Sequence, residues 1–323
     1  MNRTEVAAKQ LEERVAAWAK TRPDIRAAVV VGSRARTDHP ADEWSDLDIV
    51  IVTRDPERYL ARSDWLQDIG NPWLTFLEQT ATGGEMERRV LFEGGFDVDF
   101  AVIPNSKVKQ AARFLPVLKR LPILLRLLPK GVARQMMQDV AAAAHVFARG
   151  ARVIVDKDGL AGKLPLILSG SQPCRPPSQP EFVEVVSDFW YHTAWTAKKL
   201  RRRELWVAKS CCDVYVKRLL LRMMEWHARA TKGWDHDTWE GGRFLEEWAD
   251  PRALEGLRDA FAHYDEVDIR RALFATMDLF RWLAIETAER LSYPYPTLAD
   301  QHVTEWITTC LSEGAASESS AGG

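Results

Sequence analysis

Short apolar runs bounded by polar breaks recur through the first half of the chain, and this pattern is typical of buried strands joined by turns. The two clearest runs are Ala27–Val31 and Ile49–Val52. Between them, Gly32-Ser33 breaks the first strand, and residues 34–37 can begin a helix. Further strands are predicted over residues 73–80, 88–92, 96–103 and 152–156, with a hairpin turn at Glu93-Gly94-Gly95.

Helical periodicity flanks these strands and then dominates the second half of the chain. Thr4–Lys20 has its apolar residues on one face, and residues 54–68 and 136–149 are also predicted helices. From residue 181 onward, helices are predicted over residues 182–199, 206–229, 243–248, 252–264, 267–290 and 302–311. The predicted fold class is therefore α+β, with a mixed β-sheet flanked by helices followed by an all-α helical bundle.

Composition marks the boundaries between these parts. Residues 169–180, SGSQPCRPPSQP, are rich in Gly and Pro and are predicted to form a linker. This linker divides the chain into a sheet domain over residues 1–168 and a helical domain over residues 181–311. Residues 312–323 are mainly Ser, Gly and Ala, and we expect a disordered tail there.

Two acidic residues stand at the head of the second predicted strand. Asp46 and Asp48 are two residues apart, so their side chains point to the same face of an extended chain. Paired carboxylates can hold a hard divalent cation such as Mg²⁺, which prefers oxygen ligands. The Gly32-Ser33 turn offers backbone N–H groups and a hydroxyl to phosphate oxygens. In the structural alternative, Asp46 caps the start of the strand and Asp48 is solvated.

A third acidic position lies on the predicted hairpin. Apolar and polar residues alternate over residues 96–101, which places Asp97 and Asp99 on one face. Together, Gly32-Ser33-Arg34, Ser45-Asp46-Leu47-Asp48 and Asp99 resemble the signature of the nucleotidyltransferase superfamily related to DNA polymerase β. Asp99 matches the third acidic residue of that signature. The resemblance implies that residues 1–168 form a nucleotidyltransferase catalytic domain.

The helical half carries a second, narrower resemblance. Its parts are Asp188 before Phe-Trp, then Ala197-Lys198, then Arg202-x-Glu204-Leu205, then Ala208-Lys209. This block is similar to one in the aminoglycoside 6-adenylyltransferases, bacterial enzymes that modify streptomycin. The similarity extends over most of the chain. It implies that residues 181–311 form a helical acceptor-binding domain.

The chemistry implied by this family is transfer of AMP from ATP, the co-substrate, to a hydroxyl of an aminoglycoside such as streptomycin, with Mg²⁺ as cofactor. Asp46 and Asp48 would bind both metal ions. Asp99 would hold the catalytic metal and orient or deprotonate the acceptor hydroxyl. The Gly32-Ser33 turn and Arg34 would hold the triphosphate.

The family resemblance also implies substrate contacts from the helical half. Asp188 and His192 lie four residues apart, on one face of a helix. Asp188 would pair with an amine or guanidinium of the acceptor, or act as a general base, and Glu204 would contact the acceptor. Three basic residues would reach the triphosphate: Lys198, Arg202 and Lys209. The alternative for this group is a solvated helix face with local ion pairs.

Charge and composition narrow the range of partners. The 323 residues carry a formal net charge of −2, which gives no basic footprint for nucleic acid. Residues 1–177 are slightly basic and residues 178–313 slightly acidic. This split suits a nucleotide triphosphate and a cationic acceptor, although so small a difference also arises by chance. The four cysteines lack C-x-x-C spacing and the N-terminus lacks an apolar signal core, so we expect free thiols and a cytoplasmic protein.

The most apolar stretch is residues 114–129, FLPVLKRLPILLRLLP. It is too short to span a membrane, and basic residues and prolines interrupt it. We favour a buried, kinked helix. The alternative is a basic, apolar surface element that touches a membrane or a partner.

Two other functions stay open from the residues alone. A nucleotidyltransferase of the same superfamily could act on another acceptor, such as a lincosamide, a metabolite, a protein or a tRNA. The chain could also be a non-catalytic nucleotide-binding protein, against which the intact set of Asp46, Asp48 and Asp99 argues.

Overall fold

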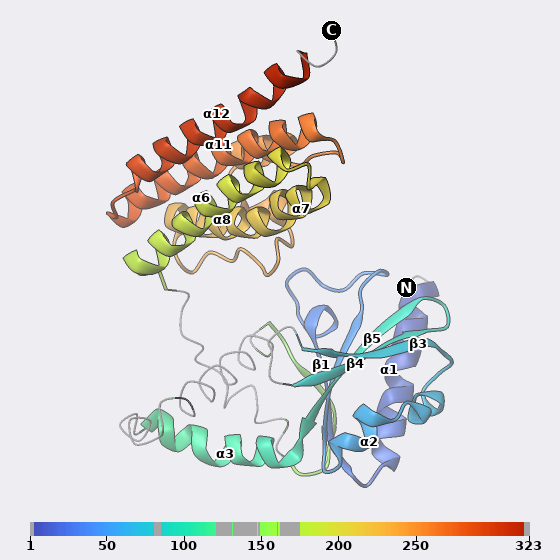
Figure 1. Cartoon of the computed structure of the whole chain (residues 1–323). Helices are drawn as coiled ribbons and strands as arrows, with labels where there is room; N and C mark the ends of the chain where they lie inside the picture. Colours follow the sequence, from blue (N-terminus) through green and yellow to red (C-terminus); the bar gives the residue numbers. More distant parts are fainter. Residues whose placement is uncertain are drawn as a thin grey trace. The chain divides into compact units, whose positions relative to one another are not determined.

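The structure is a computed structural model of the chain, and it describes residues 3–80, 85–120, 149–159 and 175–319, together with residues 131, 147 and 161. The chain forms two compact units, Met1–Gln172 and Pro173–Gly323 (Figure 1). The change from one unit to the other falls within residues 169–180, the segment expected to be a linker.

Six strands form the mixed sheet of the first unit, in the order β3-β4-β5-β2-β1-β6. Their bounds are β1 Ile25–Val31, β2 Leu47–Thr53, β3 Pro72–Gln79, β4 Met86–Phe92, β5 Phe96–Pro104 and β6 Arg152–Asp156. β2 and β5 are parallel, and the other neighbouring strands are antiparallel. The predicted strands, their hairpin and the mixed sheet are confirmed.

Helices cover both faces of this sheet (Figure 1). They are α1 (Arg3–Thr21) and α2 (Pro56–Ala61) on one face and α3 (Asn105–Arg120) on the other. On the first face, Ile49 and Phe100 are buried in one cluster with Trp18 and Trp65, whose rings stack 4.9 Å apart. On the second face, Val50 packs in a cluster with residues of α3. The central strands are therefore buried on both sides, which explains their continuous apolar runs.

The prediction of one helix over residues 54–68 was wrong. This segment forms two short helices, α2 and η2 (Asp64–Asp68). The carboxylate of Asp55 caps the start of α2, and the extended backbone of Arg62 (φ −119°, ψ 151°) ends it. The extended backbone of Arg62 therefore divides a segment whose periodicity suggested a single helix.

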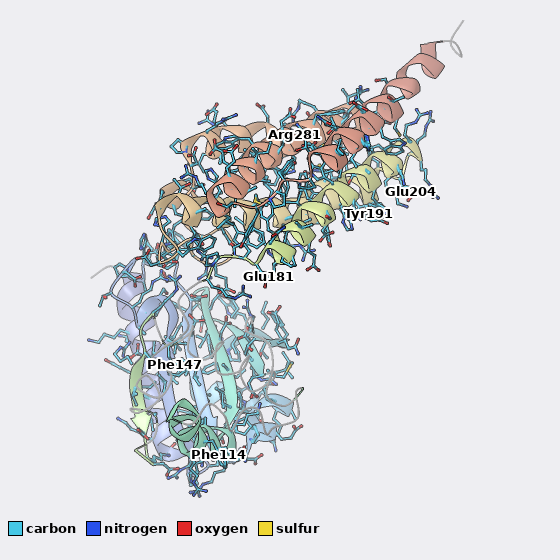
Figure 2. All side chains as sticks on the ribbon, turned by 90° about the vertical axis from the view of Figure 1, so that its left-hand side faces the viewer. Phe114, Phe147, Glu181, Tyr191, Glu204 and Arg281 are labelled. Carbon is cyan, nitrogen blue, oxygen red and sulfur yellow. The ribbon has the colours of Figure 1, made fainter. Side chains whose placement is uncertain are left out.

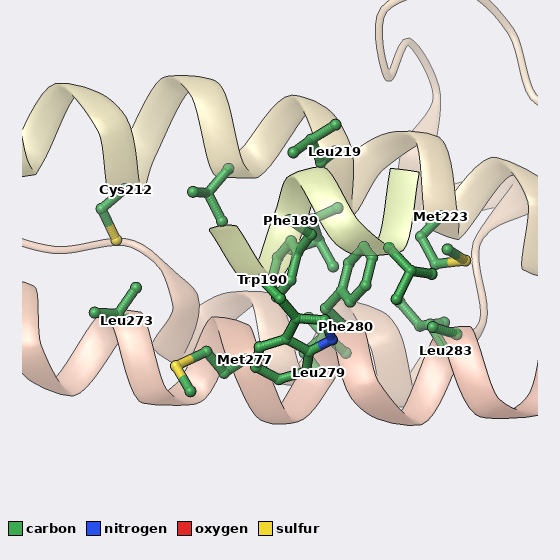
Figure 3. Packing of buried hydrophobic residues seen from close by; sticks show 14 of the residues in the cluster. Phe189, Trp190, Cys212, Leu219, Met223, Leu273, Met277, Leu279, Phe280 and Leu283 are labelled. Carbon is green, nitrogen blue, oxygen red and sulfur yellow. The ribbon is translucent and has the colours of Figure 1, made fainter. Parts of the chain in front are cut away.

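The second unit is built from helices within the residues that the structure describes. Their bounds are α6 Gln179–Arg201, α7 Leu205–Ser210, α8 Val216–Lys232, α9 Leu245–Trp248, α10 Pro251–Ala260, α11 Glu266–Leu291 and α12 Thr297–Ser319. A π-helical turn, Cys211–Tyr215, joins α7 to α8. In the core, Phe189 of α6 stacks on Phe280 of α11 with ring centroids 3.6 Å apart (Figure 3). The predicted helical bundle is confirmed.

Two helices extend past the limits expected from composition. α6 begins at Gln179, inside the predicted linker, because Ser178 and Glu181 form a capping box. α12 continues to Ser319 and so covers most of the segment predicted to be a disordered tail. Alanine and glutamate residues in that segment favour helix, and the prediction gave more weight to its serine and glycine residues.

The apolar stretch over residues 114–129 is only partly described. Its first residues belong to α3, and its remainder lies outside the described residues, as does most of the helix predicted over residues 136–149. Among the helices that the structure describes, none is long and apolar enough to cross a membrane.

Candidate functional site

The parallel pairing of β2 and β5 brings three acidic residues together. It sets Asp48 directly opposite Asp99, and Asp46 immediately precedes β2. One carboxylate oxygen from each of the three lies within 4.8 Å of the other two. Asp97, on the same face of β5, is exposed and is not part of this group. The three residues predicted as metal ligands therefore converge at one point.

The turn after β1 lies against these carboxylates. Gly32–Arg34 forms a single turn of 3₁₀ helix, η1, in place of the helix predicted to begin over residues 34–37. Gly32 has a φ of +69°, and a Cβ at this position would lie 2.0 Å from Oδ2 of Asp48. Glycine is the residue that permits both this conformation and this close approach. The backbone of the turn and the carboxylate of Asp48 are therefore in direct contact.

Ser33 and Arg34 differ in what their side chains bind. The Ser33 hydroxyl is buried and has no hydrogen-bond partner among the described residues. Leaving a buried hydroxyl without a partner is unfavourable, and a bound phosphate oxygen would satisfy it. The Arg34 guanidinium donates to the carbonyl oxygens of Ser45 and Asp46, at 2.6 and 2.9 Å. Arg34 therefore fastens the loop that carries Asp46, and a triphosphate contact would compete with these bonds.

Burial raises the pKa of Asp99 from 3.8 to about 6. The Arg89 guanidinium opposes this shift in pKa, whereas the carboxylates of Glu87, Asp46 and Asp97 add to it. Nη2 of Arg89 lies 3.4 Å from Oδ2 of Asp99. The carboxylates around Asp99 therefore carry more negative charge than Arg89 compensates.

This set of donors fits a hard divalent cation. Three carboxylates supply oxygen ligands, and their mutual repulsion would be relieved by a bound cation. Mg²⁺ usually combines one or two carboxylates with substrate phosphates. The contact between Gly32 and Asp48 sets the unpartnered Ser33 hydroxyl close to the place where such phosphates would bind. Asp46, Asp48 and Asp99 could therefore hold Mg²⁺ beside a phosphate-binding turn.

In the second unit, Asp188 lies at the centre of a hydrogen-bonded group. Nδ1 of His192 lies 2.7 Å from its Oδ1, and the Tyr215 hydroxyl donates to both carboxylate oxygens at 3.0 and 3.2 Å. The hydrogen bond to Asp188 raises the pKa of Tyr215. The structure therefore brings Asp188 and His192 together and adds Tyr215 from the π-helical turn.

Asp188 also lines an open groove of about 440 Å³. The charged residues of its lining are Arg175, Glu181, Glu184, Asp188, Arg222 and Glu225. Arg175 is already paired with Glu181 at 2.7 Å, and burial raises the pKa of Glu225. Carboxylates outnumber guanidinium groups in this groove, so a cationic ligand is favoured over an anionic one.

Glu204 lies far from this group. Figure 2 shows Glu181 and Glu204 toward opposite ends of α6, with Tyr191 between them. Because a helix rises about 1.5 Å per residue, Asp188 and Arg201 are separated by roughly 20 Å. The predicted acceptor-binding residues therefore divide into two places, and one small molecule bound at Asp188 would not reach Glu204.

Local ion pairs occupy the polar groups around Glu204. Its carboxylate lies 2.6 Å from Nζ of Lys199 and 2.6 Å from Nε of Arg202. The hydrogen bond from Lys199 lowers the pKa of Glu204. The geometry here matches the alternative of a helix end with local ion pairs.

Lys198 and Lys209, which were predicted to reach the triphosphate, also have partners within the second unit. Nζ of Lys209 pairs with Asp213 and donates to a backbone carbonyl at 2.6 Å. Nζ of Lys198 lies 5.3 Å from the ring centroid of Trp306. These contacts do not involve the carboxylates of the first unit, so the triphosphate role of both lysines stays a prediction.

Arg89 and Tyr215 were missed from the sequence, for different reasons. Counting outward from the Gly94-Gly95 turn pairs Arg89 with Asp99, so the register of the predicted hairpin contained this signal. Tyr215 is 27 residues from Asp188, on a separate helical segment. No local pattern links those two residues.

Replacing Gly32 by alanine is expected to abolish metal binding at the three carboxylates. The new methyl group would collide with Oδ2 of Asp48, and the positive φ adds roughly 1–2 kcal/mol of backbone strain. The matched control is Gly95→Ala, because Gly95 also has a positive φ, +79°, but no atom lies within 4 Å of its Cβ position. Metal binding is measured by titrating Mn²⁺ and recording its electron paramagnetic resonance signal. Equal Mn²⁺ affinity in the two variants would contradict the contact with Asp48.

Asp99→Asn is expected to stabilise the metal-free protein near neutral pH. The pKa of Asp99 is raised to about 6 in the folded protein, so ionisation of this carboxylate lowers the free energy of unfolding as pH rises from 3.8 through 6. Below pH 3.8 the carboxyl group is protonated in both the folded and the unfolded protein, and this loss of stability is absent. A shift of this size corresponds to roughly 2–3 kcal/mol. In EDTA, the free energy of unfolding should rise at about pH 7.5 and change little at about pH 4.

The control for this measurement is Asp97→Asn on the exposed part of the same strand. That variant should change the unfolding free energy little at either pH. If Asp99→Asn is no more stable than the unmodified protein at the higher pH, the carboxylate is not desolvated as described.

Known proteins resemble this chain along most of its length. The aminoglycoside 6-adenylyltransferase of Campylobacter jejuni is 23% identical over 299 residues, covering 93% of this chain and 94% of that protein. The aminoglycoside 6-adenylyltransferase of Bacillus subtilis (strain 168) is 23% identical over 291 residues, covering 87% and 90%. A solved structure described as an aminoglycoside 6-adenyltransferase from Bacillus subtilis covers 94% of this chain and 97% of its own, at 19% identity and a TM-score of 0.42.

A family profile covers the same region. The profile described as streptomycin adenylyltransferase matches residues 6–310, which include both the three carboxylates and the groove at Asp188. The resemblance expected from the residues is confirmed by this match. The chain belongs to the streptomycin adenylyltransferase family of nucleotidyltransferases.

Proposed function

We propose that the protein transfers AMP from ATP to a hydroxyl group of an aminoglycoside such as streptomycin, with Mg²⁺ as cofactor. The observation that carries this proposal is the convergence of Asp46, Asp48 and Asp99 against the Gly32-Ser33 turn. Membership of the streptomycin adenylyltransferase family supports the same chemistry. The relatives named above are aminoglycoside 6-adenylyltransferases, which supports the class of acceptor.

In the proposed reaction, the acceptor hydroxyl attacks the α-phosphorus of ATP. A new oxygen–phosphorus bond forms, the bond to the leaving pyrophosphate breaks, and AMP stays on the acceptor. Mg²⁺ held by the three carboxylates would neutralise the charge of the phosphates. The backbone of Gly32 and the hydroxyl of Ser33 hold the triphosphate, and Asp46 stays in place because Arg34 fastens its loop.

Asp99 has a second role in this proposal. Its carboxylate orients the acceptor hydroxyl and accepts its proton, which then passes to solvent. Without metal, burial and the neighbouring carboxylates raise the pKa of Asp99 to about 6, and a bound Mg²⁺ would lower it. With Mg²⁺ in place, Asp99 would therefore be ionised at neutral pH and able to accept a hydrogen bond from the acceptor hydroxyl.

The groove at Asp188 is the proposed place for the cationic acceptor. Its excess of carboxylates favours amines and guanidinium groups, and Tyr215 and His192 hold the Asp188 carboxylate in one orientation. We assign Asp188 to a charged group of the acceptor rather than to proton transfer, because Asp99 already fills that role. Lys198, Arg202 and Lys209 stay candidates for the triphosphate, whereas an acceptor held at Asp188 would not reach Glu204, whose carboxylate is paired with Lys199 and Arg202.

Pyrophosphate release with ATP, Mg²⁺ and a panel of aminoglycosides tests the proposed function. Release should require the acceptor, and AMP should appear on it by mass spectrometry. Asp48→Asn should lower the rate by roughly 100-fold or more, because one metal ligand is lost from the reacting centre. Asp97→Asn, on the exposed neighbour, should retain the rate.

Two results would contradict this function. One is full activity in Asp48→Asn, which would remove the proposed metal site. The other is release that depends on a different class of acceptor, such as a lincosamide or a tRNA, and is absent with every aminoglycoside.

Asp188→Asn is expected to weaken binding of the acceptor without affecting ATP. Loss of a charge-assisted hydrogen bond is worth about 1.5–3 kcal/mol, so KM for the acceptor should rise about 10- to 100-fold. Initial rates measured at varied acceptor and varied ATP separate the two constants. The control is Asp259→Asn, which removes an exposed aspartate of α10 that lies 3.9 Å from Arg271. An equal rise in KM for ATP would place Asp188 elsewhere than at the acceptor.

A further inference from the structure

We propose that Arg89 is a positioning residue for nucleotidyl transfer, acting through Asp99 from the adjacent strand. Arg89 stands directly opposite Asp99 in the antiparallel pair of β4 and β5. Its Nη2 lies 3.4 Å from Oδ2 of that carboxylate. The inference rests on the proposed function, which gives Asp99 its place beside the metal and the acceptor hydroxyl.

The Arg89 guanidinium is anchored at one end and reaches Asp99 with the other. Its Nε lies 2.9 Å from a carboxylate oxygen of Glu78 and 3.1 Å from one of Glu87. Neither glutamate belongs to the three converging carboxylates. Because the guanidinium is planar and rigid, fixing Nε also fixes the direction in which Nη2 points. Glu78 and Glu87 therefore aim Arg89 at Asp99.

This ion pair restrains the Asp99 carboxylate. A carboxylate paired with a guanidinium through one oxygen has its other oxygen available to a ligand elsewhere. β5 lies between β4 and β2, so Arg89 and Asp48 flank Asp99 from opposite sides. Arg89 thus contacts Asp99 from the side of β4, while Asp48 lies on the side of β2.

The order of the strands also places Arg89 on the side where the acceptor enters. The η1 turn follows β1. In the sheet, β2 separates β1 from β5. In an in-line displacement the attacking oxygen enters opposite the leaving group. With the triphosphate at η1, the acceptor hydroxyl approaches from the side of β5 and β4. Glu78 and Glu87 balance the charge of Arg89, so a cationic acceptor is not repelled.

The neighbouring arginine shows what a purely structural role looks like here. Arg88 points to the opposite face of the sheet, where it is buried. It donates from Nε to the carbonyl oxygen of Tyr59 at 3.0 Å and from Nη1 to the hydroxyl of Thr75 at 3.2 Å. Arg88 has partners that hold the fold together, whereas Arg89 is half-exposed and faces the converging carboxylates.

The first test measures turnover of the full-length protein. Arg89→Met keeps much of the side-chain length and removes the charge, and Arg89→Lys restores the charge without the planar fork. We expect kcat to fall about 10- to 100-fold in Arg89→Met, with partial recovery in Arg89→Lys and KM for ATP changed by less than about twofold. The control Arg62→Met removes an exposed ion pair with Asp64 in the same unit and should retain kcat.

The second test measures Mn²⁺ binding without ATP or acceptor, by electron paramagnetic resonance. Removing the positive charge beside Asp99 should tighten Mn²⁺ binding several-fold in Arg89→Met. Glu87→Gln removes a negative charge that acts on Asp99 and leaves the charge of Arg89 less balanced, so it should weaken Mn²⁺ binding several-fold. Variants that only damaged the sheet would weaken binding in both cases and lower the melting temperature.

Slower turnover together with tighter Mn²⁺ binding in Arg89→Met supports the proposal. An unchanged kcat overturns it, and so does weaker Mn²⁺ binding in both Arg89→Met and Glu87→Gln. If the unmodified protein adenylylates no aminoglycoside, the proposed function fails. In that case, opposite Mn²⁺ responses of the two variants still support the role of Arg89, and responses of the same sign overturn it.

Discussion

The parallel pairing of β2 with β5 is the constraint on which the site depends. It sets Asp48 opposite Asp99 on one face of the sheet, and it buries Ile49 and Phe100 on the other. Because side chains alternate along a strand, a shift of one residue in this register would exchange the apolar and acidic faces. The packing of the core therefore fixes the position of the carboxylates, and no separate interaction has to align them.

The same site opposes stability at two points. Asp99 is desolvated among like charges, and the buried Ser33 hydroxyl lacks a partner among the described residues. Both features are unfavourable in the protein without ligands, and they fit a metal ion and a phosphate, respectively. Apolar clusters on both faces of the sheet offset these costs. The fold therefore tolerates a highly charged edge because its central strands are buried on both sides.

The parts that could be predicted from the sequence are those that local physics determines. Central strands buried on both faces give continuous apolar runs, and strand alternation alone puts Asp46 and Asp48 on one side. The single helix expected over residues 54–68 was wrong because the extended backbone of Arg62 divides it. The contact of Tyr215 with Asp188 joins two helical segments, and no periodic pattern specifies such a contact. The pairing of Arg89 with Asp99 could have been predicted, because the register of the hairpin sets these two residues opposite each other.

The length of α6 separates two groups of polar side chains in the helical unit. The helix has 23 residues and is fixed at its start by a capping box. Asp188 on it binds Tyr215 and His192, whereas Glu204 beyond its end binds a different set of side chains. Under the proposed function, substitutions near Asp188 would alter which acceptor is preferred while leaving the distant ion pairs intact. Acceptor preference could then change by single substitutions without unfolding the helical unit.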